Sequence, residues 1–331
     1  MSTVVGFGEV MARLSPPGRG LLANATTLEL TYAGAEANVL AALAGFGEPT
    51  RLVTRLPENR LGDGCLALFR GLGVGVDCIV RGGVRLGLYF LEQGAPPRPS
   101  RVLYDRVGSA LADMKPGTVD WDRALDGADW FHWTGITPAV SESAWRCCRE
   151  ALEAAQARSM TVSCDLNHRA SLWQWGRTPA EVMPEMVGEC DVLIGNEDAA
   201  RAMLGASPTG GDLAAACENV ARRFPRLRAI AYTRRVEEGP TSVLEGHLLC
   251  EDASFRATIA EPAVVVDAIG AGDALAAGLI YHLRRDDGPD RALAFALACW
   301  ALKQTVPGDV ARFSVADVEA VLEGSGRRVL R

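Results

Sequence analysis

Short apolar runs typical of strands alternate with amphipathic segments typical of helices along most of this 331-residue chain. The strand-like runs include VVGFGEV (4–10), TRLVTRL (50–56), DWFHWTGI (129–136), MTVSCDLN (160–167), CDVLIGN (190–196), LRAIAYT (227–233) and AVVVDAI (263–269). Helical patterns occupy 36–47, 142–158, 212–224 and 290–304. A helix between successive strands favours parallel pairing, with helices on both faces of the sheet. We therefore predict an α/β fold with a mostly parallel sheet, in a single domain spanning 1–331.

Two regions interrupt this alternation. Residues 10–32 and 85–110 contain short alternating runs joined by Pro- and Gly-rich turns, with no helical pattern between them. Such segments are typical of hairpins. We expect them to leave the main sheet and form a small β-lid over a site, although a decorated edge of the main sheet would give the same pattern.

Composition excludes several classes of function. The formal net charge of −7 and a pI near 5.3 argue against a nucleic-acid or anionic-membrane partner. No run approaches the ~18 apolar residues of a membrane span, and MSTVVGFGEV lacks the charged start of a secretory signal. The nine cysteines form no C-x-x-C pair and are expected to be reduced and mostly buried. These features predict a cytoplasmic protein without a transition-metal site.

The stretch AVVVDAIGAGDALAAGLI (263–280) places a glycine turn between a strand-like run and a helix-like one. Backbone amides at such a helix start point outward, and the helix dipole adds positive potential, so the turn is suited to phosphate. It is not a P-loop, because the G-x-x-x-x-G-K-[ST] spacing is absent. Asp273 beside the glycines is the unusual feature, since a carboxylate repels phosphate unless it takes part in the chemistry.

Phosphoryl transfer to an alcohol needs both hydrogen-bond donors for the phosphoryl group and a base for the hydroxyl proton. Amides of Gly270 to Asp273 can stabilise charge on the transferred group, and the Asp273 carboxylate can accept the hydroxyl proton. The alternative at this stage is structural: an aspartate after a glycine turn can simply be the N-cap of the following helix.

At this point the chain resembles a known family. The motif D-x-x-G-A-G-D at 267–273 and YAGAEANVLAALAGFG at 32–47 are similar to the two signatures of the PfkB (ribokinase-like) carbohydrate kinases. GLYFLE, VLYDRVGSA, DWFHWTGITPA, CDLNHRASLW and ALKQTVPGD are similar to segments of 2-keto-3-deoxygluconate kinases within that family. The resemblance covers the whole chain and implies a ribokinase-like three-layer α/β/α domain with a β-sheet lid.

The resemblance also implies roles for individual residues. The catalytic group comprises Asp273 as base with Gly270, Ala271 and Gly272 as an anion hole. The residues implied to hold the acceptor are Gly34, Asn38, Tyr89, Tyr104, Arg106, Asn167 and Arg169. ATP is expected to lie near Asn196, Thr233, Gly270 and Gly272, with Mg²⁺ held mainly through water near Asn196 and Glu197. Whether K⁺ is also required stays open.

The two arginines predict the chemical class of the acceptor. A guanidinium binds a carboxylate through two hydrogen bonds, and two such groups would be wasted on a neutral sugar. Arg106 and Arg169 therefore indicate a sugar acid, while a structural ion pair remains the alternative for either one.

The sequence departs from the family pattern mainly at Ala199, where an acidic residue usually helps to organise the magnesium waters. Either Glu197 or Asp198 compensates for it, or the metal site is weaker. The leading hypothesis is ATP-dependent phosphorylation of a primary hydroxyl of a small sugar acid, with 2-keto-3-deoxy-D-gluconate as the expected acceptor and its 6-phosphate as the product. The alternatives are a kinase for fructose, ribose or a nucleoside, and a non-catalytic sugar or nucleotide sensor on the same scaffold. Exposed strands in the lid favour a homodimer.

Overall fold

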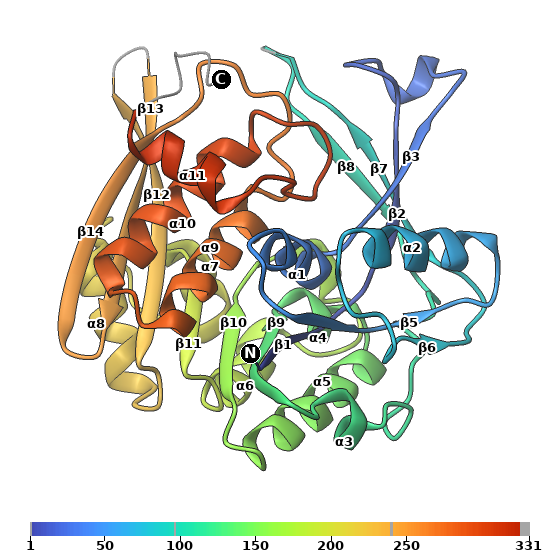
Figure 1. Cartoon of the computed structure of the whole chain (residues 1–331), viewed down its shortest axis with the longest axis horizontal. Coiled ribbons are helices and arrows are strands. Elements are labelled where there is room, and N and C mark those ends of the chain that lie inside the picture. The colour runs from blue at the N-terminus through green and yellow to red at the C-terminus, as the bar shows by residue number, and fades with distance from the viewer. Residues whose placement is uncertain (1, 96, 239–240, 325–331) are drawn as a thin grey trace.

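The structure, a computed structural model, describes residues 2–95, 97–238 and 241–324. An eight-stranded sheet in the order β14-β13-β12-β11-β10-β9-β1-β4 forms its centre (Figure 1). The strands are β1 (Thr3–Phe7), β4 (Thr50–Val53), β9 (Ala128–Thr134), β10 (Thr161–Asp165), β11 (Val192–Gly195), β12 (Ala229–Glu238), β13 (Thr241–Cys250) and β14 (Ala253–Ala260). The six strands from β4 to β12 pair in parallel, and β13 and β14 continue antiparallel. The predicted mostly parallel sheet is confirmed.

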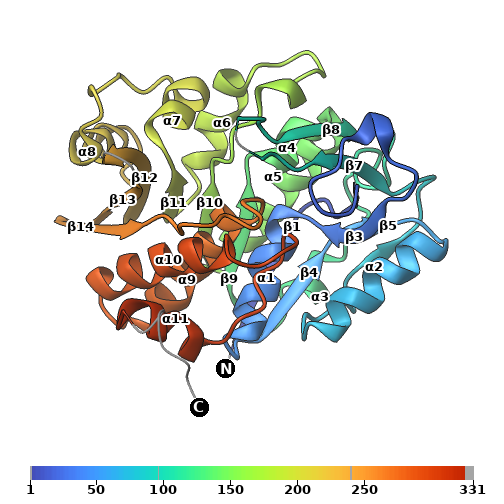
Figure 2. The same cartoon turned by 90° about the horizontal axis from the view of Figure 1, so that it is seen from above.

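Helices cover both faces of this sheet, which gives three layers (Figure 2). One hydrophobic core includes residues of α1 (Ala35–Gly45), α2 (Arg60–Gly71), α9 (Ala271–Arg285), α10 (Pro289–Lys303) and α11 (Val315–Leu322). The other includes residues of α3 (Trp121–Ala124), α5 (Glu142–Gln156), α6 (Pro179–Val187), α7 (Glu197–Leu204) and α8 (Leu213–Arg223), with α4 (Ile136–Val140) packed on α5. Strand side chains alternate between the two cores: Val4 faces the first, and Val5 and Phe7 face the second. None of the helices in the described ranges is both long and apolar enough to cross a membrane.

A separate four-stranded sheet projects from this body (Figure 1). Its order is β3 (Glu29–Ala33), β2 (Met11–Ser15), β7 (Gly87–Glu92) and β8 (Arg101–Asp105), with β2 and β7 parallel and both outer pairs antiparallel. These strands come from the two regions that lack helical patterns. Because none of them pairs with the main sheet, the sheet is not a decorated edge. Two-residue strands β5 (Arg55–Leu56) and β6 (Val80–Arg81) and the short 3₁₀ turns Leu22–Asn24 and Ala170–Leu172 complete the described elements.

The strand predicted at 263–269 is wrong. This segment is irregular, and Val264 is 69% exposed. Its amides at Val266 and Asp267 donate to the carbonyl of Gln304 at the end of α10 rather than to a neighbouring strand. The apolar run therefore crosses from β14 to α9 without joining the sheet. Strands β13 and β14, which precede it, were not predicted, because their polar outer faces weaken the apolar signal.

Buried Glu36 fixes the start of α1. One carboxylate oxygen, Oε1, accepts hydrogen bonds from the Thr134 amide (3.0 Å), the Thr134 hydroxyl (2.9 Å) and the Thr137 hydroxyl (2.8 Å). Burial raises the pKa of this carboxyl to about 7. A Cβ at Gly8 would lie 2.0 Å from Glu36 Oε2, so only glycine fits there. These contacts tie α1, and with it Asn38, to the carboxyl end of β9.

Candidate active site

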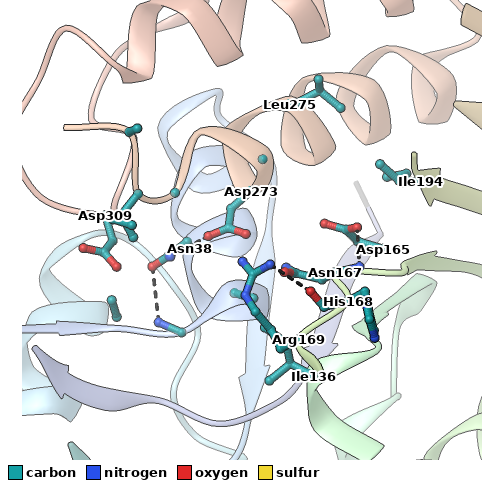
Figure 3. A pocket seen from close by; sticks show the side chains of 18 of the residues that line it. Asn38, Ile136, Asp165, Asn167, His168, Arg169, Ile194, Asp273, Leu275 and Asp309 are labelled. Carbon is teal, nitrogen blue, oxygen red and sulfur yellow. Dashed lines mark hydrogen bonds between the residues drawn. The ribbon is translucent and has the colours of Figure 1, made fainter. Parts of the chain in front are cut away.

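A cavity of about 760 Å³ lies where the carboxyl ends of β10 and β11 and the middle of β12, at Thr233, meet the start of α9, the start of α1 and the small sheet. Ligands of open α/β sheets bind at this strand edge. Asp165 and Asp273 line the cavity from opposite sides in Figure 3, with Arg169 below them. The sequence-predicted residues that line it are Gly34, Asn38, Tyr89, Tyr104, Asn167, Arg169, Asn196, Thr233, Gly270, Gly272 and Asp273.

The start of α9 forms an anion cradle. Gly270 is the N-cap residue in a left-handed conformation, with φ of +81°, and a Cβ there would lie 1.9 Å from the Asp309 carbonyl oxygen. The Ala271 amide is directed back to the Ala268 carbonyl at 3.3 Å, and its side chain is buried away from the cavity. Within the described residues, the amides of Gly272 and Asp273 donate to no other backbone group. Open space next to Gly272 leaves room for a phosphate.

Asp273 is not the capping residue, because α9 begins at Ala271 and Gly270 precedes it. Its Oδ2 accepts a hydrogen bond from Asn38 Nδ2 at 2.7 Å. Burial raises the pKa of Asp273 to about 8, and the carboxylates of Asp165 and Asp309 add to this, while the Asn38 hydrogen bond opposes it. A carboxylate with a raised pKa is a stronger proton acceptor, so the group is suited to general-base chemistry near neutral pH.

Arg169 is the one lysine or arginine that lines the cavity in the part of the chain that the structure describes. It follows β10 and is solvent-accessible, and the only described hydrogen bond of its side chain runs from Nη1 to the His168 carbonyl at 3.2 Å. Burial lowers the pKa of His168, which favours the neutral imidazole. Burial also raises the pKa of neighbouring Asp165 to about 6. The guanidinium thus remains available to an anionic group of a ligand.

Arg106 is placed elsewhere. It lies just beyond β8, is 7% exposed, and does not line the cavity. Its guanidinium donates to Glu9, with Nε to Oε2 at 2.7 Å, and Ser109 donates to the other oxygen of Glu9. The geometry therefore matches the structural ion pair that the sequence left open. Nothing in the sequence pattern connected residue 9 with residue 106, because the pairing joins the end of β1 to the small sheet.

The start of α7 also lines the cavity, through Asn196, Asp198 and Ala199. Asn196 is the N-cap, and its Oδ1 accepts from the Ala199 amide at 2.8 Å. Glu197 turns away from the cavity and accepts from the amide and hydroxyl of Thr209, so Asp198 is the acidic side chain of this helix that lines the cavity. The described residues contain no cluster of three metal-ligating side chains. This donor set would suit a Mg²⁺ ion that keeps most of its water ligands and is bound through the phosphates of a nucleotide better than one coordinated only by protein side chains.

Asp309 is the residue that sequence reasoning missed. It lines the cavity and accepts hydrogen bonds from Tyr89 of β7 and Arg13 of β2. Arg13 also donates to Asp267 Oδ2 at 2.7 Å, so one guanidinium joins the small sheet to both loops that flank the anion cradle. The only signal in the sequence was the position of this aspartate within ALKQTVPGD, a segment used for the resemblance and not for a role.

A helix start suited to phosphate, a buried aspartate beside it and a second sheet against the same cavity are the features expected of a phosphotransferase of the α/β class. Residues 1–313 match the model of the pfkB family carbohydrate kinases. The chain belongs to this family and is a carbohydrate kinase.

Two similar proteins act on keto-deoxy sugar acids according to their names. The chain is 34% identical to 2-dehydro-3-deoxygalactonokinase of Haloferax volcanii, over 97% of this chain and 96% of the relative. It is 38% identical to the crystal structure of 2-dehydro-3-deoxygluconokinase from Thermotoga maritima, with a TM-score of 0.92 and 98% of both chains covered. An Escherichia coli protein described as ribokinase II, solved with ATP and Mg²⁺, shares the fold at 17% identity and a TM-score of 0.79, with 98% of this chain and 100% of that one covered.

Proposed function

We propose that this kinase transfers the γ-phosphoryl group of ATP to the primary hydroxyl of 2-keto-3-deoxy-D-gluconate. The observation that carries the proposal is Arg169, a cation without a carboxylate partner among the described residues, in a cavity otherwise lined by Asp165, Asp198, Asp273 and Asp309. Without that guanidinium an acid would meet only like charges. The names of the two similar kinases support the same class of acceptor.

In the proposed mechanism Asp273 accepts the proton of the attacking hydroxyl at its free Oδ1, while Asn38 holds Oδ2. The amides of Gly272 and Asp273 stabilise negative charge on the transferred group. Asn196, Asp198 and Thr233 lie on the side of the cavity proposed for ATP and its magnesium waters. Mg²⁺ supplies charge neutralisation of the phosphates when bound.

We further propose that the chain acts as one domain and that the sheet β3-β2-β7-β8 is its lid. Tyr89 and Tyr104 are opposite each other on β7 and β8, and both line the cavity. A lid of this kind excludes water, which would otherwise compete with the sugar for the phosphoryl group. Tyr89 also bonds to Asp309, which places the lid directly against the cavity wall.

The test is ADP release with MgATP and an acceptor panel of 2-keto-3-deoxygluconate, its galacto epimer, gluconate, fructose, ribose and adenosine. We expect turnover on the keto-deoxy acids, loss of roughly 10²–10⁴-fold in Asp273→Asn, and a raised acceptor KM in Arg169→Met. Arg146→Met on the exposed face of α5 is the matched control.

Turnover on a neutral sugar that Arg169→Met leaves unchanged would contradict the acid acceptor and favour the kinase for another sugar. ATP binding without turnover on any acceptor would favour the sensor. Both keto-deoxy acids carry the carboxylate that Arg169 is proposed to bind, so Arg169 does not distinguish the two epimers. The turnover rates on the two acids in the panel give the preference.

A homodimer through the lid is a second part of the proposal. The lid exposes Leu30 (46%) and Leu103 (59%) on one face, in the row Leu30-Leu14-Phe90-Leu103, together with Leu28 (40%) just before β3, whereas Val102 lies on the other face and lines the cavity. An apolar patch on a twisted sheet with open edges is suited to a second copy of the same sheet. Light scattering should give twice the chain mass, and Leu103→Asp should give the monomer; a monomeric wild type contradicts this. The nine free cysteines support a reducing compartment, which we propose is the cytoplasm.

A further inference from the structure

Lys303 is a buried cation that the proposed mechanism does not use. The chain has 34 basic residues, and only Lys115 and Lys303 among them are lysines. Lys115 is exposed, whereas Lys303, the last residue of α10, is 0% exposed. Burying an ammonium group is costly unless it is well solvated by the protein. All basic residues except Lys115 and Lys303 are arginines, so the position of the one buried lysine calls for an explanation.

That place is the junction of the two loops that build the anion cradle. Lys303 Nζ donates to the backbone carbonyls of Asp267 (3.2 Å) and Val306 (3.4 Å). Asp267 begins the turn that leads to Gly270, and Val306 begins the loop that leads to Asp309. The ammonium thus holds the two loops together from behind the cradle. The negative end of the α10 dipole lies at the same point and favours a cation there.

The charges around Lys303 are mostly negative. Burial lowers the pKa of the Lys303 ammonium below its usual value, while Asp267, Asp309 and Asp273 oppose this by stabilising the protonated form and Arg13 lowers the pKa further. None of these carboxylates lies within ion-pair distance of Nζ in the described residues, so the ammonium is held by carbonyl oxygens. Asp267 is itself fully engaged: its Oδ1 accepts from the Ile269 amide (3.0 Å), and its Oδ2 accepts from the Gly308 amide (3.2 Å) and from Arg13.

We propose that Lys303 is a positioning residue for phosphoryl transfer, a tethered monovalent cation that sets the geometry of the anion cradle and supplies positive charge behind it. An ammonium cradled by carbonyl oxygens does the work that a bound K⁺ ion of similar size would do. The inference rests on the proposed phosphoryl transfer, and it predicts that the enzyme needs no added K⁺. Arginine would not replace Lys303, because a planar guanidinium cannot fit between two carbonyls that converge on one nitrogen.

The experiment compares wild type, Lys303→Met and the matched control Lys115→Met, with tetramethylammonium as the only monovalent cation. We expect kcat of wild type to be unchanged by added KCl. We expect Lys303→Met to stay folded, because Met fills a similar volume, and to lose roughly 10- to 100-fold in kcat with little change in acceptor KM. Added K⁺, NH₄⁺ or methylammonium should restore part of that loss, whereas choline should not. Lys115→Met should behave as wild type.

Three results would overturn the proposal: a wild type that requires K⁺, a folded Lys303→Met with wild-type kcat, or a slow Lys303→Met that no small cation restores. A purely structural lysine would give lower stability with unchanged kcat per folded molecule. The assay uses whichever acceptor the panel identifies, so an error in the acceptor leaves this test intact.

If Lys303→Met fails to fold, NMR of wild-type protein labelled with nitrogen-15 lysine tests the proposal without any variant. Only two side-chain ammonium signals exist, and the signal of Lys303 should persist at pH 7.5 and shift when MgATP binds, while that of Lys115 does not. A Lys303 signal that titrates to the neutral amine below pH 7, or that ignores MgATP, would refute the role.

Discussion

The pH dependence of turnover should report Asp273 directly. The carboxylate must be ionised to accept a proton, so activity is lost as the pH falls through its pKa, which burial and two neighbouring carboxylates raise to about 8. With that pKa, about 10% of the group is ionised at pH 7 and about 1% at pH 6. Below pH 8, kcat/KM for the acceptor should therefore fall about tenfold per pH unit.

Asn38 gives this prediction a second, independent arm. Its amide donates to the charged carboxylate at 2.7 Å and lowers the pKa of Asp273. A hydrogen bond to a charged group contributes about 1.5–3 kcal/mol, which corresponds to roughly 1–2 pKa units. In Asn38→Leu the pH below which kcat/KM falls should therefore rise by about that amount. The loss of kcat/KM relative to wild type should be large at pH 7 and smaller at higher pH.

The assay is coupled ADP release between pH 6 and 10 at saturating MgATP, with the melting temperature recorded at each pH. Asn219→Leu on α8 is the matched control, because this asparagine also has a side-chain hydrogen bond, accepted from Arg222, but does not line the cavity. A flat profile between pH 6 and 9, or a fall in kcat/KM that moves to lower pH in Asn38→Leu, would refute Asp273 as the base.

Further predictions concern the cradle and the residues that hold it. Gly270→Ala should lower kcat more than about 100-fold, since its Cβ would lie 1.9 Å from the Asp309 carbonyl; wild-type activity would show that the loop yields freely. Arg13→Met should cost about 3–5 kcal/mol of unfolding free energy in urea titration, against about 0.3–0.5 for Arg146→Met at the exposed Glu142 pair, and equal losses would contradict the buried network. The pKa of Glu36 is raised from 4.5 to about 7, so wild type should lose roughly 3 kcal/mol of stability as the pH rises from 4.5 through 7, and Glu36→Gln should not; parallel pH curves would argue against this.

The sequence predicted the architecture well because periodicity and the two signatures are local signals. The helices at 36–47 and 142–158 lie within a few residues of the observed α1 and α5. The strand at 263–269 failed for a tertiary reason: its apolar residues had no strand beside them, and their amides bond to the end of α10 instead. Apolar content alone does not distinguish these two cases.

The candidate site was predictable where one segment carries it and not where two distant segments meet. The glycines and aspartate at 270–273 lie together in both sequence and space. Arg106 was assigned to the acceptor because its charge was visible, whereas its partner Glu9, 97 residues away, was not. Asp309 was missed for the same reason, since its partners Arg13 and Tyr89 lie far along the chain.

The pairing of Arg13 with Asp309 has a consequence for biosynthesis. The two residues are 296 positions apart, and at ~5–20 residues per second the ribosome needs roughly 15–60 s to add the second after the first. For most of that interval the guanidinium of Arg13 lacks both carboxylates, because Asp267 is added 254 residues after it, and Tyr89 lacks its acceptor until Asp309 is made. A chain that terminates before Asp309 therefore lacks the contacts that hold the small sheet and the anion cradle in place. We expect such truncated chains to show no ATP hydrolysis.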